Sequence, residues 1–472
     1  MQVSLHTSTK PALMIRFRVK HLLRLLLTLC LSLVIPGVVA SADSENRAAD
    51  ANGLGKEHVV LNQPPEAASA PETPAPEADS KTLAPGSTPD SKGIENQVRT
   101  RELEQALKRY RQAIRELDAY GPYHEQSSEA LFGLGETLKN HGLYKEAIIT
   151  LRRAMHINRV NHGLHSLSQA PILESIIETQ KALNLFENVT TNYSRLLNLF
   201  LKNHDANHPS LIPLLQELAL WHISMYQLDS STSRVDHITS ANGLINAALK
   251  NAQAAPELDT QAHIELLRIT ALVNLYASQH EGDQWATALD APYSASADQE
   301  FMSLSRMATL SKTGFKKGRI AHEQIIKLAE MDEDNSPERI ITAYVEAGDW
   351  YLLFNRRNQA MNYYERAHEL ITASDQSEML MAQWFSQPVF LPAVLSVTKP
   401  EHLPTRHITA ELDISESGRP SQINLLEPST ESGLGLRRSA LKTIRQARFR
   451  PRFADGKPVE TKASRISIPL IH

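Results

Sequence analysis

Apolar residues recur at helical spacing from about residue 98 to about residue 385, and this long pattern limits the fold more than any other feature. Within it, residues 128–158 place two small residues, Gly135 and Ala147, on successive amphipathic segments. Small side chains let two antiparallel helices approach closely, while larger apolar residues fill the space around them. Aromatic residues make up only 6% of the 472 residues, which suits an array of helices better than a β-sandwich. The pattern therefore predicts a mainly helical chain built from helix pairs.

Two stretches of this region resemble the tetratricopeptide repeat (TPR) consensus. The first covers residues 128–158 and the second covers residues 338–371. The matching positions are Leu131, Leu134, Gly135, Leu138, Gly142, Tyr144, Ala147, Leu151 and Ala154 in the first stretch, and Tyr344, Ala347, Gly348, Tyr351, Ala360, Tyr364 and Ala367 in the second. The resemblance implies degenerate TPR-like repeats over residues 96–380, which must stack into an α-solenoid to bury their apolar faces.

A longer period supports repeats between these two matches. His124, His165 and His208 each precede an apolar helical pattern, and they are 41 and 43 residues apart. This spacing is similar to that of a long TPR variant of about 42 residues. Residues 230–310 are less regular.

The first 42 residues have the composition of an export signal. Arg16, Arg18, Lys20 and Arg24 precede the uncharged apolar run 25–39, and Ala40-Ser41-Ala42 offers a cleavage site. An uncleaved anchor is the alternative, although a spanning helix needs about 20 apolar residues. The only cysteine, Cys30, lies in the run, so the cleaved chain contains no thiol for disulfides or metal sites. Lipidation of Cys30 is a weaker alternative because the bulky Leu29 precedes it.

Residues 43–95 are rich in Pro, Ala and Glu and contain little apolar material, so we expect a disordered linker. Without residues 1–42, the chain has 44 basic and 53 acidic residues. A net charge of about −9 argues against nucleic acid as a partner. We expect membrane contact only if residues 1–42 are retained.

The pattern changes after residue 385. Pro388, Pro392, Pro400 and Pro404 are too dense for a helix. Alternation then predicts a strand at 407–415, followed by a turn and a second strand at 421–429. A short amphipathic helix at 437–449 and a last strand at about 461–471 complete a β-β-α-β order.

This order resembles the C-terminal domain of the TonB family over residues 388–472. The matching elements are Gly418, Ser429, Ala440-Leu441, Phe449-Arg450-Pro451, Gly456-Lys457-Pro458-Val459 and Ile466-Ser467-Ile468-Pro469. The resemblance implies that the last strand pairs with a peptide of an envelope partner, for which an outer-membrane receptor is one candidate. The residues implied are Thr461, Lys462, Ala463, Ser464, Arg465, Ile466, Ser467 and Ile468. The alternative is that the preceding Pro-rich segment covers this strand.

A run of basic residues with no acidic residue among them begins at Arg437 and continues with Arg438, Lys442, Arg445, Arg448, Arg450 and Arg452. It is interpreted as the solvated face of a short helix. The alternatives are a patch for an acidic partner, lipid headgroup or cell-wall polymer, and docking on the acidic helical body.

No motif for catalysis or nucleotide binding occurs, so we expect neither an enzyme nor a cofactor. The pairs His162/His165 and His204/His208 have metal-like spacing but lie at predicted loops, so we expect no metal. Trp350 and Tyr363 point away from the TPR consensus face, and we expect them to line a binding groove. These observations favour a periplasmic protein–protein interaction scaffold with a TonB-like docking domain. The alternative is a TonB-type energy transducer for receptor-mediated transport, which requires a retained anchor.

Overall fold

The computed structural model describes residues 91–228, 234–255, 258–280, 295–331, 336–391, 406–426 and 434–470. The predicted export signal, nearly all of the predicted linker and the Pro-rich segment at 392–405 lie outside the described residues. No helix in the described ranges combines the length and the apolar character needed to cross a membrane.

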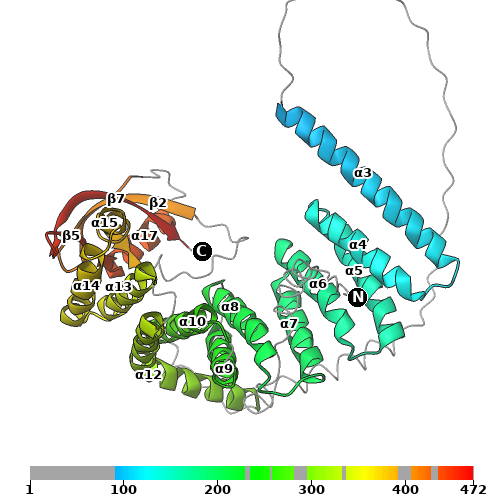
Figure 1. Cartoon of the computed structure of the whole chain (residues 1–472), viewed down its shortest axis with the longest axis horizontal. Coiled ribbons are helices and arrows are strands. Elements are labelled where there is room, and N and C mark those ends of the chain that lie inside the picture. Colours follow the sequence, from blue (N-terminus) through cyan, green and yellow to red (C-terminus); the bar gives the residue numbers. More distant parts are fainter. Residues whose placement is uncertain are drawn as a thin grey trace, which may run out of the picture. The chain divides into compact units, whose positions relative to one another are not determined.

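The chain is mainly helical and ends in a small α+β tail, as predicted (Figure 1). The helices are α3 (Ser91–Asp118), α4 (Glu125–Asn140), α5 (Tyr144–His162), η1 (Leu167–Gln169), α6 (Ala170–Ala182), α7 (Phe186–Leu201), η2 (Pro209–Leu211), α8 (Ile212–Leu228), α9 (Arg234–Gln253), α10 (Thr260–Gln279), α12 (Ala295–Met331), α13 (Pro337–Leu353), α14 (Arg357–Thr372), α15 (Ser377–Trp384) and α17 (Leu434–Gln446). The strands are β1 (Val389–Phe390), β2 (Arg406–Ile414), β3 (Pro420–Leu425), β4 (Phe449–Arg450), β5 (Arg452–Ala454), β6 (Lys457–Val459) and β7 (Thr461–Leu470).

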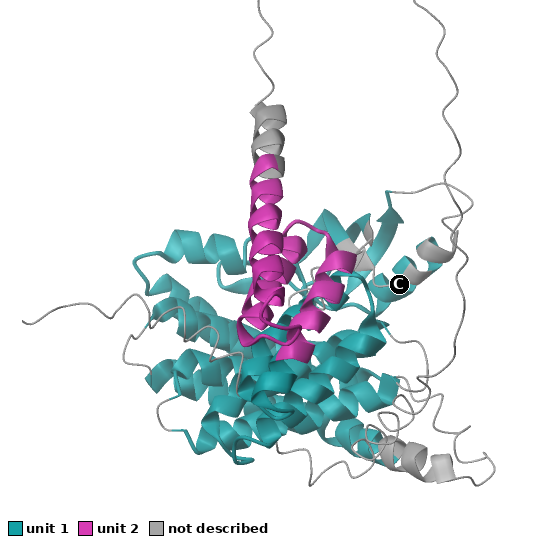
Figure 2. Cartoon of the chain, turned by 90° about the vertical axis from the view of Figure 1, so that its right-hand side faces the viewer, with its two compact units in different colours: residues 1–31, 158–472 teal, residues 32–157 magenta. Residues whose placement is uncertain are grey.

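The described residues form two compact units that divide within α5, after Ile157 (Figure 2). In the unit of residues 32–157, drawn in magenta in Figure 2, α3 packs on α4 where the Tyr110 ring covers Gly133, since a Cβ there would lie 2.7 Å from the ring. A Cβ on Gly135 would lie 2.6 Å from the Leu151 side chain of α5. The close helix approach predicted at Gly135 is therefore confirmed.

In the unit that contains residues 158–472, every helix from α6 to α15 buries apolar side chains. The three histidines that were predicted to precede helices, His124, His165 and His208, do lie at the starts of helices. His124 is the N-cap of α4, and His165 directly precedes Ser166, which caps η1. His208 caps η2, where its Nδ1 accepts a hydrogen bond from the Ser210 amide at 3.4 Å. At Ser166 and His208 the capping side chain accepts a hydrogen bond from an amide that the helix leaves unpaired, whereas the His124 side chain makes no such bond.

The tail contains a three-stranded antiparallel sheet in the order β3-β2-β7, a short antiparallel pair of distant segments, β1–β4, and a short hairpin, β5–β6. One face of β2 presents Ile408, Ala410, Leu412 and Ile414, which are all buried. They pack in one apolar cluster with Ala440 and Ile444 of α17 and with Ala447, which directly follows α17. The strand–strand–helix–strand order expected from the sequence is present, with β1, β4, β5 and β6 added at the side that meets the helices.

Candidate functional site

Strand β7 lies at one end of the β3-β2-β7 sheet. It pairs with β2 from Arg406↔Leu470 to Ile414↔Thr461. Among the strands of the described residues, β2 is its only neighbour. Edge strands of this kind are templates for adding a further strand.

The register fixes which backbone groups of β7 face away from β2. The Leu426 amide donates to the Thr409 carbonyl at 3.0 Å, so the backbone of Thr409 faces β3. Because backbone groups alternate along a strand, the backbone of Ala410 faces β7 and bonds its partner Ile466. The neighbouring Arg465 and, by the same alternation, Pro469 direct their backbone groups to the outer edge. Proline has no amide hydrogen to offer there, so its place on an edge costs no hydrogen bond with β2.

A bulge interrupts β7 near its start. The pairing of β2 with β7 shifts between Leu412 and Ile414, and Ala463 has a left-handed φ of 50°. The Asp413 carboxylate accepts a hydrogen bond from the Ala463 amide at 2.8 Å. Bulges of this kind twist an edge strand and end regular pairing. The regular part of the outer edge therefore begins after Ala463.

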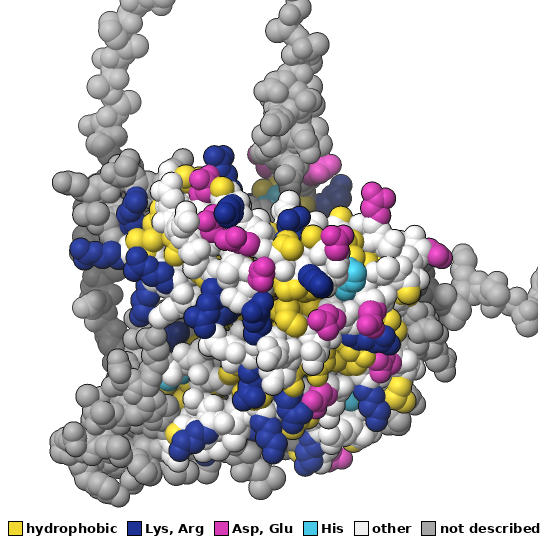
Figure 3. All heavy atoms as spheres, turned by 90° about the vertical axis from the view of Figure 1, so that its left-hand side faces the viewer, with side chains coloured by type: hydrophobic (Ala, Val, Ile, Leu, Met, Phe, Trp, Pro, Cys, Tyr) yellow, Lys and Arg dark blue, Asp and Glu magenta, His cyan; other side chains and the backbone are white. Residues whose placement is uncertain are grey.

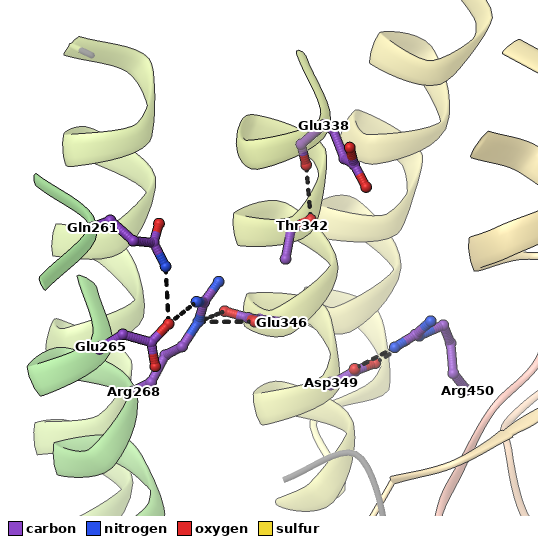
Figure 4. Close-up of polar contacts among 8 residues, drawn as sticks. All are labelled: Gln261, Glu265, Arg268, Glu338, Thr342, Glu346, Asp349 and Arg450. Carbon is purple, nitrogen blue, oxygen red and sulfur yellow. Dashed lines mark hydrogen bonds and ion pairs between the residues drawn. The ribbon is translucent and has the colours of Figure 1, made fainter. Parts of the chain in front are cut away.

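The tail is joined to the last helices by a buried ion pair (Figure 4). Arg450 Nε and Nη2 donate to the two carboxylate oxygens of Asp349 on α13, at 2.9 and 2.6 Å. Arg450 Nη1 donates to the Trp384 carbonyl at 3.1 Å, and the Tyr364 hydroxyl donates to Asp349 at 2.7 Å. Both charged side chains are at most 2% exposed. A buried pair is sustained only when its remaining donors and acceptors are satisfied, and this pair meets that requirement.

The electrostatics of this cluster follow from burial and charge. Burial lowers the pKa of Arg450, but the adjacent Asp349 carboxylate outweighs burial, and the pKa is raised. Burial, together with Asp349, raises the pKa of the Tyr364 hydroxyl well above its usual value. The guanidinium and the phenol therefore keep their protons at any physiological pH.

Apolar contacts surround the ion pair. Phe453 of β5 packs against Phe385, with ring centroids 4.6 Å apart, and edge-on against Tyr364 at 5.9 Å. The Phe453 amide also donates to the Phe385 carbonyl at 3.0 Å. Phe453 and Leu391 belong to the same apolar cluster as α10, α12, α13 and α14. The tail thus contributes residues to the core of the last helices.

A second ion pair joins α13 to α10 through the neighbouring residue Glu346. Arg268 Nε lies 3.0 Å from the Glu346 carboxylate, and Arg268 Nη1 lies 2.7 Å from Glu265 (Figure 4). Burial raises the pKa of Glu346, and Arg268 partly offsets the effect. Through Glu346 and Asp349, which are three residues apart, α13 is linked to both α10 and the tail.

The turn between β2 and β3 also contacts this junction. Gly418 has a φ of 71°, and a Cβ there would lie 2.0 Å from the Phe449 carbonyl and 3.3 Å from the Leu352 side chain. The Phe449 amide donates to the Gly418 carbonyl at 2.9 Å. This position needs glycine for its left-handed backbone and for its close contact with β4.

The family comparison identifies the tail. Residues 407–468 match the model of the Gram-negative bacterial TonB protein C-terminal family. This segment is a TonB C-terminal domain. The match covers most of the segment from β2 to β7, and it supports a TonB-like, envelope-associated role in protein interaction for this domain.

Comparison of the whole chain adds little to this assignment. No curated protein sequence matches it. The crystal structure of BtubC (BKLC) from P. vanneervenii aligns with 58% of this chain and 91% of its own, at 13% identity and a TM-score of 0.37. Likeness at this TM-score is too weak to assign a function or a shared fold.

The groove expected at Trp350 and Tyr363 needs a correction. Trp350 is only 1% exposed, and its indole covers Gly318 of α12, so it is a core residue and cannot line an open groove. Its position off the consensus face places it against the preceding helix instead of solvent. Tyr363 is partly exposed and stacks on Tyr351, with ring centroids 5.2 Å apart. Burial, with Tyr351 beside it, raises the pKa of Tyr363 to about 12.

The basic run after Arg437 divides into two sets. Arg438, Lys442 and Arg445 are exposed on α17, as a solvated helix face requires. Arg450 is buried, so the solvated interpretation is wrong for it and the alternative of docking on the helical body is correct. The residue missed by sequence reasoning is its partner Asp349. An isolated acid between the apolar Gly348 and Trp350 positions was the available signal.

One of the two histidine pairs with metal-like spacing brings its rings into contact. His204 and His208 lie with ring centroids 5.1 Å apart, and burial lowers the pKa of His204. In the part of the chain that the structure describes, no group of three or more His, Cys, Asp or Glu side chains is placed to hold a metal ion.

Proposed function

We propose that this chain is a periplasmic interaction scaffold whose TonB C-terminal domain binds an envelope partner by strand addition to β7. The observation that carries the proposal is the place of β7 at the end of the β3-β2-β7 sheet. An extended peptide would pair with the outward backbone groups after the bulge at Ala463, within the segment from Ser464 to Ile468. Thr461 and Lys462 lie before the bulge and would contribute side-chain contacts only.

The helical body has a separate part in the proposal. Its amphipathic helix pairs and small residues at close contacts support the TPR-like interpretation of residues 96–380. Stacked pairs of this kind present extended surfaces for a second protein. We propose Tyr363 as a contact residue of this surface, whereas the buried Trp350 cannot contact a partner.

A substitution at Arg465 tests strand addition. Proline there removes one outward amide without removing a hydrogen bond to β2. The full chain carrying Arg465→Pro should capture much less of its partner from detergent-solubilised outer-membrane proteins than the unchanged chain. Arg465→Ala, the matched control, removes the side chain and its 3.1 Å contact with Glu411 but keeps the backbone, so it should capture the partner normally. Equal capture by both variants would exclude pairing at this edge.

The second candidate is a TonB-type energy transducer, which is favoured by the family of the tail and by the apolar run at 25–39. It requires that residues 1–42 stay attached as an anchor. N-terminal sequencing of the protein from the cell envelope separates the two. A start at Asp43 would exclude the transducer, and an intact leader would exclude a freely periplasmic scaffold.

A further inference from the structure

Three arginines from three separate segments lie near the contact between the tail and the last helices. Arg357 begins α14, Arg419 follows the β2–β3 turn, and Arg448 lies between α17 and β4. The hydrogen bond from the Phe449 amide to the Gly418 carbonyl holds the β2–β3 turn against the segment that joins α17 to β4. Arg448 reaches the α13–α14 turn, where its Nε and Nη2 donate to Asn355 Oδ1 at 2.9 and 2.7 Å.

The positive charges of this cluster have little negative charge to balance them. The hydrogen bonds of Arg448 all end on neutral oxygens, since Nη1 donates to the carbonyls of Gln446 and Ala447. The hydrogen bond between Phe449 and Gly418 brings their chain neighbours Arg448 and Arg419 together, and burial, followed by the charge of Arg419, lowers the pKa of Arg448. Among the described residues, Arg419 makes no ion pair, and Arg357 has only a loose contact of 3.8 Å with the exposed Glu416.

This arrangement contrasts with Arg450, two residues further on, whose guanidinium is fully matched by Asp349. Guanidinium groups left beside one another repel, and a shared anion relieves the repulsion. Arginine presents its donors as a planar fork that binds a carboxylate with two parallel hydrogen bonds. We propose that Arg357, Arg419 and Arg448, the junction arginines, bind the carboxylates of an acidic peptide segment of a partner protein.

Charge and surface chemistry favour a peptide over a membrane. Residues 406–470 contain 12 basic and 7 acidic residues, a net charge of about +5, in a chain whose total is −4. Lys and Arg side chains are spread over the face of the molecule drawn in Figure 3. Surfaces that lie on lipid combine basic residues with large apolar ones that insert. Among the tail residues whose exposure the structure describes, which leave out 434–436 and 468–470, Leu426 is the only strongly exposed large apolar side chain. The inference does not depend on strand addition to β7.

Asn355→Asp is the central test. It changes one amide to a carboxylate of the same shape, directly at the Arg448 fork, and Asp tolerates the left-handed φ of 59° found there. The built-in carboxylate should satisfy Arg448 and displace the ligand. Binding of a fluorescein-labelled hexaglutamate peptide to the full chain, followed by anisotropy, should weaken by about tenfold, without a fall in the thermal unfolding midpoint.

Two further variants locate the site. Arg419→Gln with Arg448→Gln should also weaken peptide binding by about tenfold or more. Arg438→Gln with Arg445→Gln on α17 removes the same total charge at a different place and should weaken it by less than about threefold at 0.15 M salt. Glu416→Gln, which removes the competing carboxylate, should strengthen binding.

Several results would overturn the proposal. Equal loss of binding in the two arginine double variants would mean that the peptide responds only to total charge. Binding to vesicles containing phosphatidylglycerol, with none to the peptide, would assign the cluster to lipid. Peptide binding that appears only after removal of residues 43–90 would assign it to the chain's own acidic segment. A Kd unchanged by Asn355→Asp would exclude this cluster as the site.

Discussion

Removing the Asp349 carboxylate should lower the stability of the fold strongly, because it leaves the buried Arg450 guanidinium without a negative charge beside it. In Asp349→Asn, Arg450 would keep its charge at 2% exposure with no carboxylate to balance it. Losing one partner of a buried pair typically costs about 3–5 kcal/mol. We expect a loss of this size in the free energy of unfolding of the transition that includes the tail, measured by urea denaturation of the full chain.

An exposed pair supplies the contrast. Arg366 and Glu369 on α14 lie 2.9 Å apart, but both side chains are more than half exposed. Arg366→Ala should leave the urea midpoint unchanged, since water screens such pairs. Replacing both members of the buried pair, as Asp349→Leu with Arg450→Met, should restore most of the stability that Asp349→Asn loses. If Asp349→Asn were as stable as the unchanged chain, the burial of Asp349 in the structure would be contradicted.

His322 gives the helical body a pH dependence. It is 3% exposed on α12, its ring lies 5.4 Å from that of Trp350, and neither ring nitrogen has a hydrogen-bond partner among the described residues. Burial, and then the nearby Arg268, lower its pKa to about 3, far below the ordinary 6.5. The unfolded chain therefore binds a proton between pH 6.5 and pH 3 that the folded chain does not, and stability falls as pH falls through this range.

The expected loss from His322 between pH 6.5 and pH 5 is about 2 kcal/mol in the free energy of unfolding. His322→Phe should be less sensitive to acid than the unchanged chain by that amount, measured by urea denaturation at both pH values. His222, whose pKa burial and His237 also lower to about 3, remains in the variant and accounts for a residual dependence. If the free energy of unfolding fell equally with pH in His322→Phe and in the unchanged chain, His322 would be shown to take up its proton in the folded protein.

At the scale of one element, β7 combines a regular ladder with one strained residue. Ala463 adopts a φ of 50°, a conformation that costs an L-residue about 1–2 kcal/mol and glycine almost nothing. Ala463→Gly should raise the free energy of unfolding by about 0.5–1 kcal/mol, part of the relief being offset by the greater freedom of glycine in the unfolded chain. Ala463→Val should destabilise the tail. Thermal denaturation of the three proteins checks the order, and a stabilising valine would contradict the left-handed backbone.

The elements of this chain differ in how far the sequence predicts them. Alternating Ile408, Ala410, Leu412 and Ile414 predict β2 and its buried face, because strand periodicity is a local property. The small Gly135 likewise predicts a close helix contact. The bulge at Ala463 and the core position of Trp350 were not predictable, because each depends on a residue from another element: Asp413 for the bulge and Gly318 for the indole.

The candidate site was predictable in the same uneven way. Strand β7 follows from local alternation and from the resemblance to the TonB family, which the match at 407–468 confirms. The junction does not, since Asp349 and Arg450 are 101 residues apart and no periodic pattern connects them. The helical pattern alone also places the end of the helical region near residue 380, whereas Phe385, Leu391 and Phe453 all enter the core of the last helices.

For the whole molecule, the shared core implies that the TonB C-terminal domain depends on the helices before it. A fragment of residues 406–472 would expose Phe453 and leave Arg450 without Asp349, Tyr364 and the Trp384 carbonyl. Small domains have little stability to lose, so these losses should leave the fragment largely unfolded. A fragment of residues 260–472 retains α10, α12, α13, α14 and α15 with all of these contacts and with the helices that complete their core. Its amide resonances should be dispersed in a two-dimensional NMR spectrum, whereas those of the shorter fragment should collapse toward random-coil positions. Well-dispersed spectra from both would show that the tail folds alone, and that its docking on α13 is an added contact between separate domains.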